Sequence, residues 1–389
     1  MIDLNLTREE FFARCFETRF HHQRAALREV VFGWKDVNEL LYVMDPGAHG
    51  VRLFQDGPVD ETKFVETYSE LGVNRRRINK EALYRLMGEG GTLVMNRLEL
   101  VSSTIRRLCM SVSELCGAPT IANGYVAFDG NGSFGKHWDT HDVFAVQLFG
   151  RKRWKLYEPT HPLPTRHQTS RHLKEFCPPM PVFDDVLEAG DVLYVPRGWW
   201  HEALPMGEET CHVAIGTHGP TLADYAVWCC QRHLRDHFVC RKSARLDDTA
   251  SNNLVGVGEV VAEVIANPVT FEEFQRDLVA SERLSTPFHL EHFVAPRRYP
   301  IDDETELQTN SMLRVDVDRQ FLSVNGAEAP RDLRIREVLG CLTVRSHMTI
   351  ADMIIALPHL SAEEVRAAAC ALVMGNRALI RSGSLGPIS

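Results

Sequence analysis

The chain has 389 residues, which is enough for two or three domains with a sizeable hydrophobic core. With 44% hydrophobic and 24% charged residues it is not a disordered protein, and its net charge of −9 argues against a general polyanion-binding protein. No apolar run reaches the roughly 18–20 residues of a membrane span, and the segment MIDLNLTREEFF lacks the features of a signal peptide. The ten cysteines form no CxxC pair. We therefore expect a cytoplasmic protein with no membrane contact.

The N-terminal segment is predicted to be helical. Thr7 and Glu10 have the spacing of a capping box, in which each side chain bonds the other residue's backbone N–H. An apolar stripe with helical spacing follows, made of Phe11, Phe12, Cys15 and Phe16. Residues 92–114 read as a short strand and then another helix.

The middle of the chain has the pattern of an antiparallel β structure. Short apolar runs alternate with Gly, Pro and Asp; they cover residues 121–128, 142–150, 153–159, 191–200 and 211–218. Runs of this length separated by turns are typical of a sandwich or barrel. Phe149-Gly150-Arg151 is predicted to be the turn of a hairpin between two of them.

Helical patterns return after residue 219. Thr221 with Asp224, and Thr270 with Glu273, have capping-box spacing and predict two helix starts. Residues 295–311 are polar and are predicted to form an exposed linker.

The last 75 or so residues read as a separate unit. Segments 312–318 and 320–326 are predicted to be a strand pair, and 334–342 and 349–357 helices, with Ser361 capping a final helix. This order suggests a winged-helix-like domain. From Met312 to Ser389 there are nine Arg, no Lys and eight acidic residues, so a net charge of +1 argues against DNA binding and for a structural or protein-contact role.

His137-Trp138-Asp139 is the most informative motif. Residues i and i+2 of a strand share a face, so the imidazole and the carboxylate would project into one space. The motif follows a glycine-rich stretch at 129–136 and precedes the apolar run at 142–150. His201 comes 64 residues after His137, after a buried strand and a Pro-Arg-Gly turn. Two histidines and one carboxylate form the facial triad that holds Fe(II) with open positions.

Other histidines compete for this role. His141 lies two residues beyond Asp139, and His212 and His218 lie on the last apolar run. His212 and His218 lack the strand-and-turn placement of His201, and His141 would duplicate His137, so we rank all three below the triad. No HExxH motif of the zinc hydrolases is present.

Residues 121–217 resemble the JmjC/cupin-like Fe(II)- and 2-oxoglutarate-dependent oxygenases, and most closely the ribosomal-oxygenase branch. The segments GYVAFDGNGSFGKHWDTHDVFAVQLFGRKRWKLYEP and LEAGDVLYVPRGWWHEA carry this resemblance. It implies that His137, Asp139 and His201 bind iron. It also implies that Lys152 pairs with the distal carboxylate of 2-oxoglutarate and that Asn123 contributes to cosubstrate binding. The residues themselves agree for Lys152, because it begins the strand expected to pair with the ligand-bearing strand and a buried dianion needs a cation.

The resemblance also implies an architecture. The expected fold is α+β, a double-stranded β-helix of the cupin/JmjC jelly-roll type with N-terminal helices. The expected domains are a JmjC/cupin domain at 1–219, a helical dimerisation region at 220–305 and a winged-helix-like domain at 306–389, in a homodimer. One departure is Ala214, since many members have a hydroxyl residue there near the cosubstrate.

The implied activity is hydroxylation of a C–H bond with O2 while 2-oxoglutarate is converted to succinate. The expected substrate is an amino-acid side chain in a protein or peptide, with ribosomal proteins as candidates. Tyr125, Trp138 and Trp199 are expected to shape the substrate pocket. Alternatives are a peptide natural-product precursor, a tRNA base (disfavoured by the acidic charge), a small molecule, or a metal-binding cupin scaffold without activity.

Overall fold

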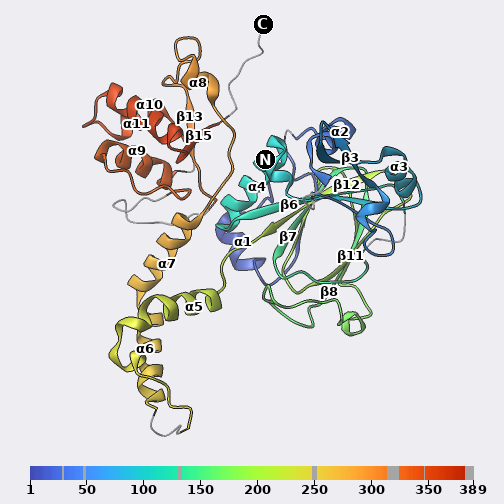
Figure 1. The fold of residues 1–389 in the computed structure, drawn as a ribbon, viewed down its shortest axis with the longest axis horizontal. Coiled ribbons are helices and arrows are strands. Elements are labelled where there is room, and N and C mark those ends of the chain that lie inside the picture. The colour runs from blue at the N-terminus through green and yellow to red at the C-terminus, as the bar shows by residue number, and fades with distance from the viewer. Residues whose placement is uncertain are drawn as a thin grey trace. The chain divides into compact units, whose positions relative to one another are not determined.

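The computed structural model describes residues 1–28, 30–46, 50–129, 134–247, 252–312, 324–345 and 347–381. The chain divides into two compact units, Met1–His218 and Gly219–Ser389 (Figure 1). The strand pair predicted at 312–318 and 320–326 lies almost entirely outside the described residues.

Two antiparallel sheets form the centre of the first unit. The larger has the order β1 (His21–Gln23), β10 (Val192–Val195), β7 (Asp142–Phe149), β12 (Thr210–Thr217), β6 (Thr120–Ala127), β5 (Thr92–Met95) and β2 (Val51–Phe54). The smaller has the order β11 (Trp200–Leu204), β8 (Lys152–Tyr157) and β9 (Phe183–Leu187). After β7 the chain crosses to the smaller sheet for β8 and β9, returns for β10, crosses again for β11 and returns for β12. The expected cupin-type β fold with N-terminal helices is confirmed.

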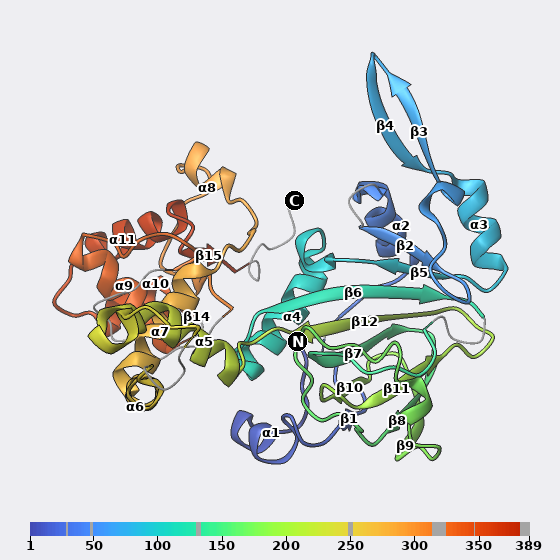
Figure 2. The ribbon, with the colours of Figure 1, turned by 60° about the horizontal axis from the view of Figure 1, so that its bottom comes forward.

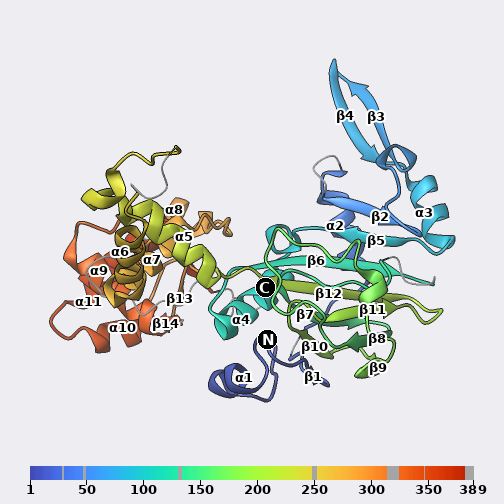
Figure 3. The ribbon, with the colours of Figure 1, turned by 90° about the horizontal axis from the view of Figure 1, so that it is seen from below.

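The two faces of the larger sheet have different tasks. On β12, Cys211, Val213 and Ile215 point to the main hydrophobic core. The alternate residues His212, Ala214 and Gly216 line a cavity on the opposite face. Helices α1 (Arg8–Arg14) and α4 (Ser103–Cys116) contribute buried side chains to the core, and α4 runs beside β6 (Figure 3). The sheet therefore separates an apolar, helix-covered side from a polar interior.

The N-terminal helices follow their capping signals. Thr7 and Glu10 form the predicted capping box at the start of α1. The unit also contains α2 (Trp34–Val43), α3 (Lys80–Gly88) and short 3-10 helices at Glu61–Lys63, Leu98–Leu100 and Lys174–Phe176. Strands β3 (Val65–Glu70) and β4 (Val73–Ile78) pair only with each other, as a hairpin that extends away from the main sheets (Figure 2).

The predicted hairpin at Phe149-Gly150-Arg151 is wrong. β7 pairs with β10 and β12 in the larger sheet, whereas β8 pairs with β9 and β11 in the smaller one. The turn therefore carries the chain from one sheet to the other. Gly150 has φ +63°, and a Cβ there would collide with the backbone carbonyl of Glu209. This crossing needs glycine for both reasons.

The second unit contains two groups of helices. The first comprises α5 (Leu222–His233), 3-10 helices at Leu234–Asp236 and Phe238–Arg241, α6 (Leu254–Ala266), α7 (Pro268–Ser281) and α8 (Leu290–Val294). The second comprises α9 (Leu333–Val344), α10 (Ile350–Ala356) and α11 (Ala362–Met374), which contact a sheet of order β14 (His347–Thr349), β13 (Glu306–Thr309), β15 (Ala378–Ile380). Each group has its own cluster of buried apolar residues.

Two local predictions in this unit need correction. Thr221 caps α5 as predicted, but Thr270 does not begin a helix, because Asn267 caps α7 and Pro268 is its first residue. The predicted linker at 295–311 contains β13, whose Leu307 is fully buried. A single inward-facing side chain between polar neighbours gave too little periodicity to predict this strand.

No single helix among the described residues is long and apolar enough to cross a membrane. The bent pair α6–α7 reaches that length and apolar character only when its two helices are taken together.

Candidate active site

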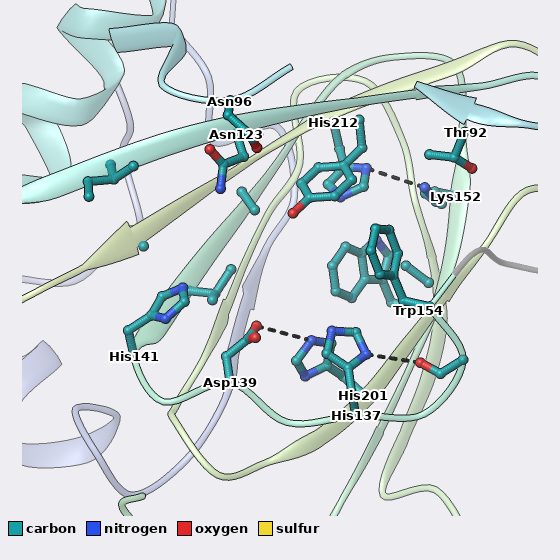
Figure 4. A pocket seen from close by; sticks show the side chains of 18 of the residues that line it. Thr92, Asn96, Asn123, His137, Asp139, His141, Lys152, Trp154, His201 and His212 are labelled. Carbon is teal, nitrogen blue, oxygen red and sulfur yellow. Dashed lines mark hydrogen bonds and ion pairs between the residues drawn. The ribbon is translucent and has the colours of Figure 1, made fainter. Parts of the chain in front are cut away.

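A cavity of about 550 Å³ lies between the two sheets of the first unit (Figure 4). Its walls come from β6, β7 and β12 of the larger sheet and from β8 and β11 of the smaller. The lining side chains include His137, Asp139, His201, Lys152, Asn123, Tyr125, Trp154, His212, His141, His218, Asn96 and Arg97. A ligand here would be held by side chains that the sheets fix in place.

His137, Asp139 and His201 converge within this cavity. One ligand atom from each lies within 4.8 Å of the others, and this is the only such group found among the described residues. The HxD motif was predicted to lie on a regular strand. The structure instead places it in the extended segment before β7. There His137 and His201 exchange backbone hydrogen bonds of 3.1 and 2.7 Å, which hold the motif against the start of β11.

Hydrogen bonds fix the orientation of both imidazoles. Nδ1 of His137 lies 2.9 Å from the Gly135 carbonyl oxygen, and Nδ1 of His201 lies 3.0 Å from that of Trp199. A carbonyl only accepts, so each Nδ1 is the protonated donor and each Nε2 keeps a free lone pair. Oδ2 of Asp139 lies 3.5 Å from Nε2 of His201. A hydrogen bond from Nδ1 to a backbone carbonyl is a common way to orient a histidine that binds metal through Nε2.

The charge states suit a cation. Burial lowers the pKa of His201 to about 4, so this imidazole is neutral at pH 7. Burial pushes the pKa of Asp139 upward, but the imidazoles of His137 and His201 lower it overall. The neutral imidazole of His201 and the carboxylate of Asp139 therefore stand together with the His137 imidazole at one point of the cavity.

The turn before His201 is held by a carboxylate and a glycine. Oδ1 of Asp142 accepts a 2.8 Å hydrogen bond from the backbone N–H of Arg197. Gly198 has φ +86°, and a Cβ there would lie 2.5 Å from the His161 carbonyl oxygen. The backbone N–H of Gly198 donates to the Asp139 carbonyl at 3.0 Å. The Pro-Arg-Gly turn thus ties the two halves of the triad together.

Lys152 brings a positive charge into the same cavity. It is 4% exposed and begins β8, which pairs with the His201-bearing strand β11. Its Nζ lies 3.5 Å from Nδ1 of His212, and no carboxylate pairs with it among the described residues. Burial lowers its pKa to about 8. A buried cation without a counter-ion is a strong reason to expect an anionic ligand.

The remaining predicted residues divide into two groups. Asn123 and Tyr125 line the cavity, and Oδ1 of Asn123 accepts a 3.2 Å hydrogen bond from the Arg97 backbone N–H. Trp138 and Trp199 do not line it, contrary to expectation. Trp138 packs with Tyr157 and Trp200, and Trp199 belongs to a separate apolar cluster. Alternation explains Trp138, because the residue between His137 and Asp139 must face the other way.

Several lining residues were missed in the sequence or given no role. Trp154 stands two residues after Lys152 on β8, and its ring lies 6.1 Å from that of His201. His212 stacks on Tyr125 at 4.8 Å and 7°. Both could have been found from the two-residue period of a strand. Asn96 and Arg97 follow β5 and carried no signal.

The residues present fit iron and 2-oxoglutarate. Two imidazoles and one carboxylate suit Fe(II), and the orphaned amine of Lys152 suits a distal carboxylate.

Residues 95–225 match the family described as the JmjC domain. This part of the chain is thus similar to a JmjC domain. All three residues of the His-Asp-His cluster fall within the matched range.

This part of the chain is also similar to parts of curated proteins called bifunctional lysine-specific demethylase and histidyl-hydroxylase NO66. The Drosophila mojavensis protein is 31% identical over 144 residues, which are 36% of this chain and 16% of that protein. The Dictyostelium discoideum protein is 30% identical over 165 residues, 41% of this chain and 32% of that protein. The matched part is thus a third or less of these relatives' length.

Solved structures agree on the fold over more of the chain. The Escherichia coli ribosomal oxygenase YcfD, in complex with cobalt and 2-oxoglutarate, has a TM-score of 0.60 and 19% identity. The match covers 98% of this chain and 100% of that one. At this identity the likeness establishes the fold alone.

Proposed function

We propose that this protein is an Fe(II)- and 2-oxoglutarate-dependent oxygenase that hydroxylates a C–H bond of an amino-acid side chain in a protein or peptide. The observation that carries the proposal is the meeting of the His137–Asp139–His201 cluster with the buried, unpaired Lys152 in one cavity. A metal-ligand set and an orphaned cation together match an anionic cosubstrate that also binds the metal.

Each residue has a defined role in this proposal. His137, Asp139 and His201 hold the iron, and their Nδ1 hydrogen bonds keep both Nε2 atoms pointed at it. Lys152 pairs with the distal carboxylate of 2-oxoglutarate, and Asn123 assists in cosubstrate binding. Trp154 and Tyr125 line the part of the cavity around Lys152 and exclude water from the cosubstrate. When bound, iron and 2-oxoglutarate supply the oxidation by O2, with release of CO2 and succinate.

The relatives support a protein substrate. NO66 proteins are named as histidyl-hydroxylases and lysine demethylases, and YcfD as a ribosomal oxygenase. Proteins of both groups thus act on protein side chains or the ribosome, and we infer the same substrate class here, with ribosomal proteins as first candidates. A peptide precursor, a tRNA base and a small molecule are less favoured. An inactive scaffold would have no need for a complete triad opposite an unpaired lysine.

The second unit is proposed to serve assembly. We assign residues 220–305 to a helical dimerisation region and 306–389 to a winged-helix-like domain, after a JmjC domain with its N-terminal helices at 1–219. In support, Leu254 and Val255 at the start of α6 are 62% and 75% exposed. Such exposed apolar side chains favour a protein contact, here a second copy. The location is proposed to be cytoplasmic.

Succinate release tests the activity. The full chain is incubated with Fe(II), 2-oxoglutarate and ascorbate, alone and with ribosomal proteins, beside the variant His137→Ala. We expect turnover that the variant loses, and a mass increase of one oxygen atom on a ribosomal protein. Absence of both metal binding and turnover in the wild-type chain would refute the oxygenase assignment and leave a cupin scaffold.

A further inference from the structure

A second pair of imidazoles lines the cavity besides the proposed iron ligands. His141 lies in the segment between Asp139 and β7, and His218 directly follows β12. Their ring centroids are 4.7 Å apart, with the rings inclined at 31°. Neither belongs to the His137–Asp139–His201 cluster. The proposed activity gives them no role so far.

Gly216 makes the space that these rings occupy. It is an inward-facing residue of β12, and a Cβ added to it would lie 2.8 Å from Nε2 of His141 and 3.2 Å from Nε2 of His218. Any side chain larger than hydrogen would thus displace the His141 ring. Because Gly216 has no side chain, the imidazoles of His141 and His218 can pack against β12 at this point of the cavity wall.

This wall lies away from the lysine. His212, which contacts Lys152, and Gly216 are four residues apart on β12, so their Cα atoms are separated by about 13 Å. Figure 4 shows His141 on the side of Asp139 away from His201 and Lys152. The proposed function places 2-oxoglutarate with Lys152 and the metal-binding cluster, which leaves the His141 end of the cavity for a substrate side chain.

The two rings present hydrogen-bonding nitrogens to this end of the cavity, which the cation Arg97 also lines. No hydrogen bond or ion pair engages a ring nitrogen of His141 or His218 within the described parts of the chain. Burial, the nearby His141 and the guanidinium of Arg97 lower the pKa of His218 to about 4, so its ring is neutral at pH 7. A neutral imidazole offers one N–H donor and one acceptor nitrogen.

A cationic substrate would find no counter-ion here. Asp139, a proposed iron ligand, is the only carboxylate among the described lining residues. The nearby Glu99 is 5% exposed and bonds Arg97 and the Ala122 backbone N–H, so it is already used. Guanidinium and ammonium groups are costly to desolvate without a carboxylate.

We propose that His141 and His218 are positioning residues that bind a planar, uncharged side chain carrying both a donor and an acceptor, an imidazole or a carboxamide. The pocket thereby excludes arginine and lysine side chains. The inference rests on the proposed function and narrows its substrate class.

Five pools of nine-residue peptides test the selectivity. Their flanks are randomised, and the central residue is His, Asn, Gln, Arg or Lys. Succinate release above the peptide-free rate is measured with the full chain, Fe(II) and 2-oxoglutarate, and tandem mass spectrometry locates the added oxygen. We expect stimulation at least tenfold stronger in one or more of the His, Asn and Gln pools than in the Arg and Lys pools.

The other outcomes are informative in distinct ways. Equal or stronger stimulation by the Arg or Lys pool overturns the inference. Peptide-free turnover with no response to any pool also overturns it, but leaves the oxygenase chemistry intact. If the wild-type chain shows no turnover and binds neither Mn(II) nor 2-oxoglutarate, the result counts against the proposed function itself.

Variants then test the two histidines. His141→Ala and His218→Ala are expected to weaken binding of the best pool at least tenfold, measured by fluorescence anisotropy with Mn(II) and 2-oxoglutarate under nitrogen. Both alanine variants should also raise the ratio of succinate to hydroxylated peptide. His141→Asn should bring this ratio part of the way back to the wild-type value. His167→Ala, an exposed histidine outside the cavity, is the control. Unchanged peptide affinity and coupling in both alanine variants would refute the positioning role.

Discussion

Lys152 carries a charge into the interior of the first unit, where no carboxylate meets it among the described residues. Replacement by Met keeps the apolar stem and removes the charge. We predict that Lys152→Met weakens 2-oxoglutarate binding about a hundredfold, because truncating one partner of a buried charge pair costs 2–5 kcal/mol or more. Titration of the Mn(II)-loaded protein with 2-oxoglutarate measures this.

Lys155→Met is the matched control, since Lys155 lies on the same strand but outside the cavity lining. An affinity within threefold of wild type in Lys152→Met would show that this lysine does not hold the cosubstrate.

The same lysine makes the stability of the ligand-free protein depend on pH. Its pKa falls from an ordinary value of 10.5 to about 8, mainly through burial. The folded-state pKa is the lower one, so the unfolded chain binds more protons between pH 8 and 10.5 and stability rises with pH there. Below pH 8 the full cost of the buried charge, about 3 kcal/mol, is present. We predict that Lys152→Met is more stable than wild type at pH 7 and that most of this advantage, all but about 1 kcal/mol, is lost by pH 10.

Urea unfolding of both proteins at pH 7 and at pH 10 provides the measurement. Taking the difference between the two proteins cancels the titration of other groups. A difference that stays constant across this range would contradict the low pKa.

The metal cluster could be predicted at the residue scale because its signals are local. His137 and Asp139 share a face through the two-residue period of extended chain. His201 could be predicted because an apolar strand and a Pro-Arg-Gly turn precede it. Trp138 and Trp199 were misjudged because aromatic identity alone does not say which of two interior clusters a side chain joins. Asn96 and Arg97 reach the cavity only through the pairing of β5 with β6, which is a long-range contact.

At the scale of elements, the crossing between β7 and β8 is the most constrained connection of the first unit. Gly150 combines a positive φ with a backbone carbonyl in the space of a Cβ, whereas Gly207 has φ +75° and open space around it. We predict that Gly150→Ala destabilises the protein by about 3 kcal/mol and Gly207→Ala by about 1 kcal/mol, since strain acts at both sites but the clash at only one. Urea denaturation of both variants gives the two values, and equal losses would refute the close approach.

The same connection shows why the turn was mistaken for a hairpin. A Gly between two apolar runs reports that the chain reverses, but not which sheet receives the next strand. Helix starts were better predicted, because a capping box is complete within four residues, as in α1, α5 and α11. Thr270 failed where the competing signal Asn267-Pro268 was stronger.

For the whole molecule, the sequence predicted a β interior between helical segments, and this is the observed order. It could not predict that β1, from the N-terminal segment, pairs with β10, or that β2 and β5 extend the larger sheet. Those pairings join residues far apart in the chain, and three- or four-residue strands carry little periodicity of their own. Local order was therefore readable and long-range register was not.

The division of the chain into two units leads to a prediction about where the cofactors bind. Every residue that lines the cavity, from Thr92 to His218, belongs to the unit Met1–His218, and this unit has its own hydrophobic cores. We predict that a fragment of residues 1–220 folds and binds Mn(II) and 2-oxoglutarate with affinities within about threefold of the full chain, because no described contact of the cavity would be lost. Titration of fragment and full chain under the same conditions compares them, with Lys152→Met in the fragment as the negative control. A folded fragment that binds Mn(II) but not 2-oxoglutarate would show that residues beyond 220 complete the cosubstrate site.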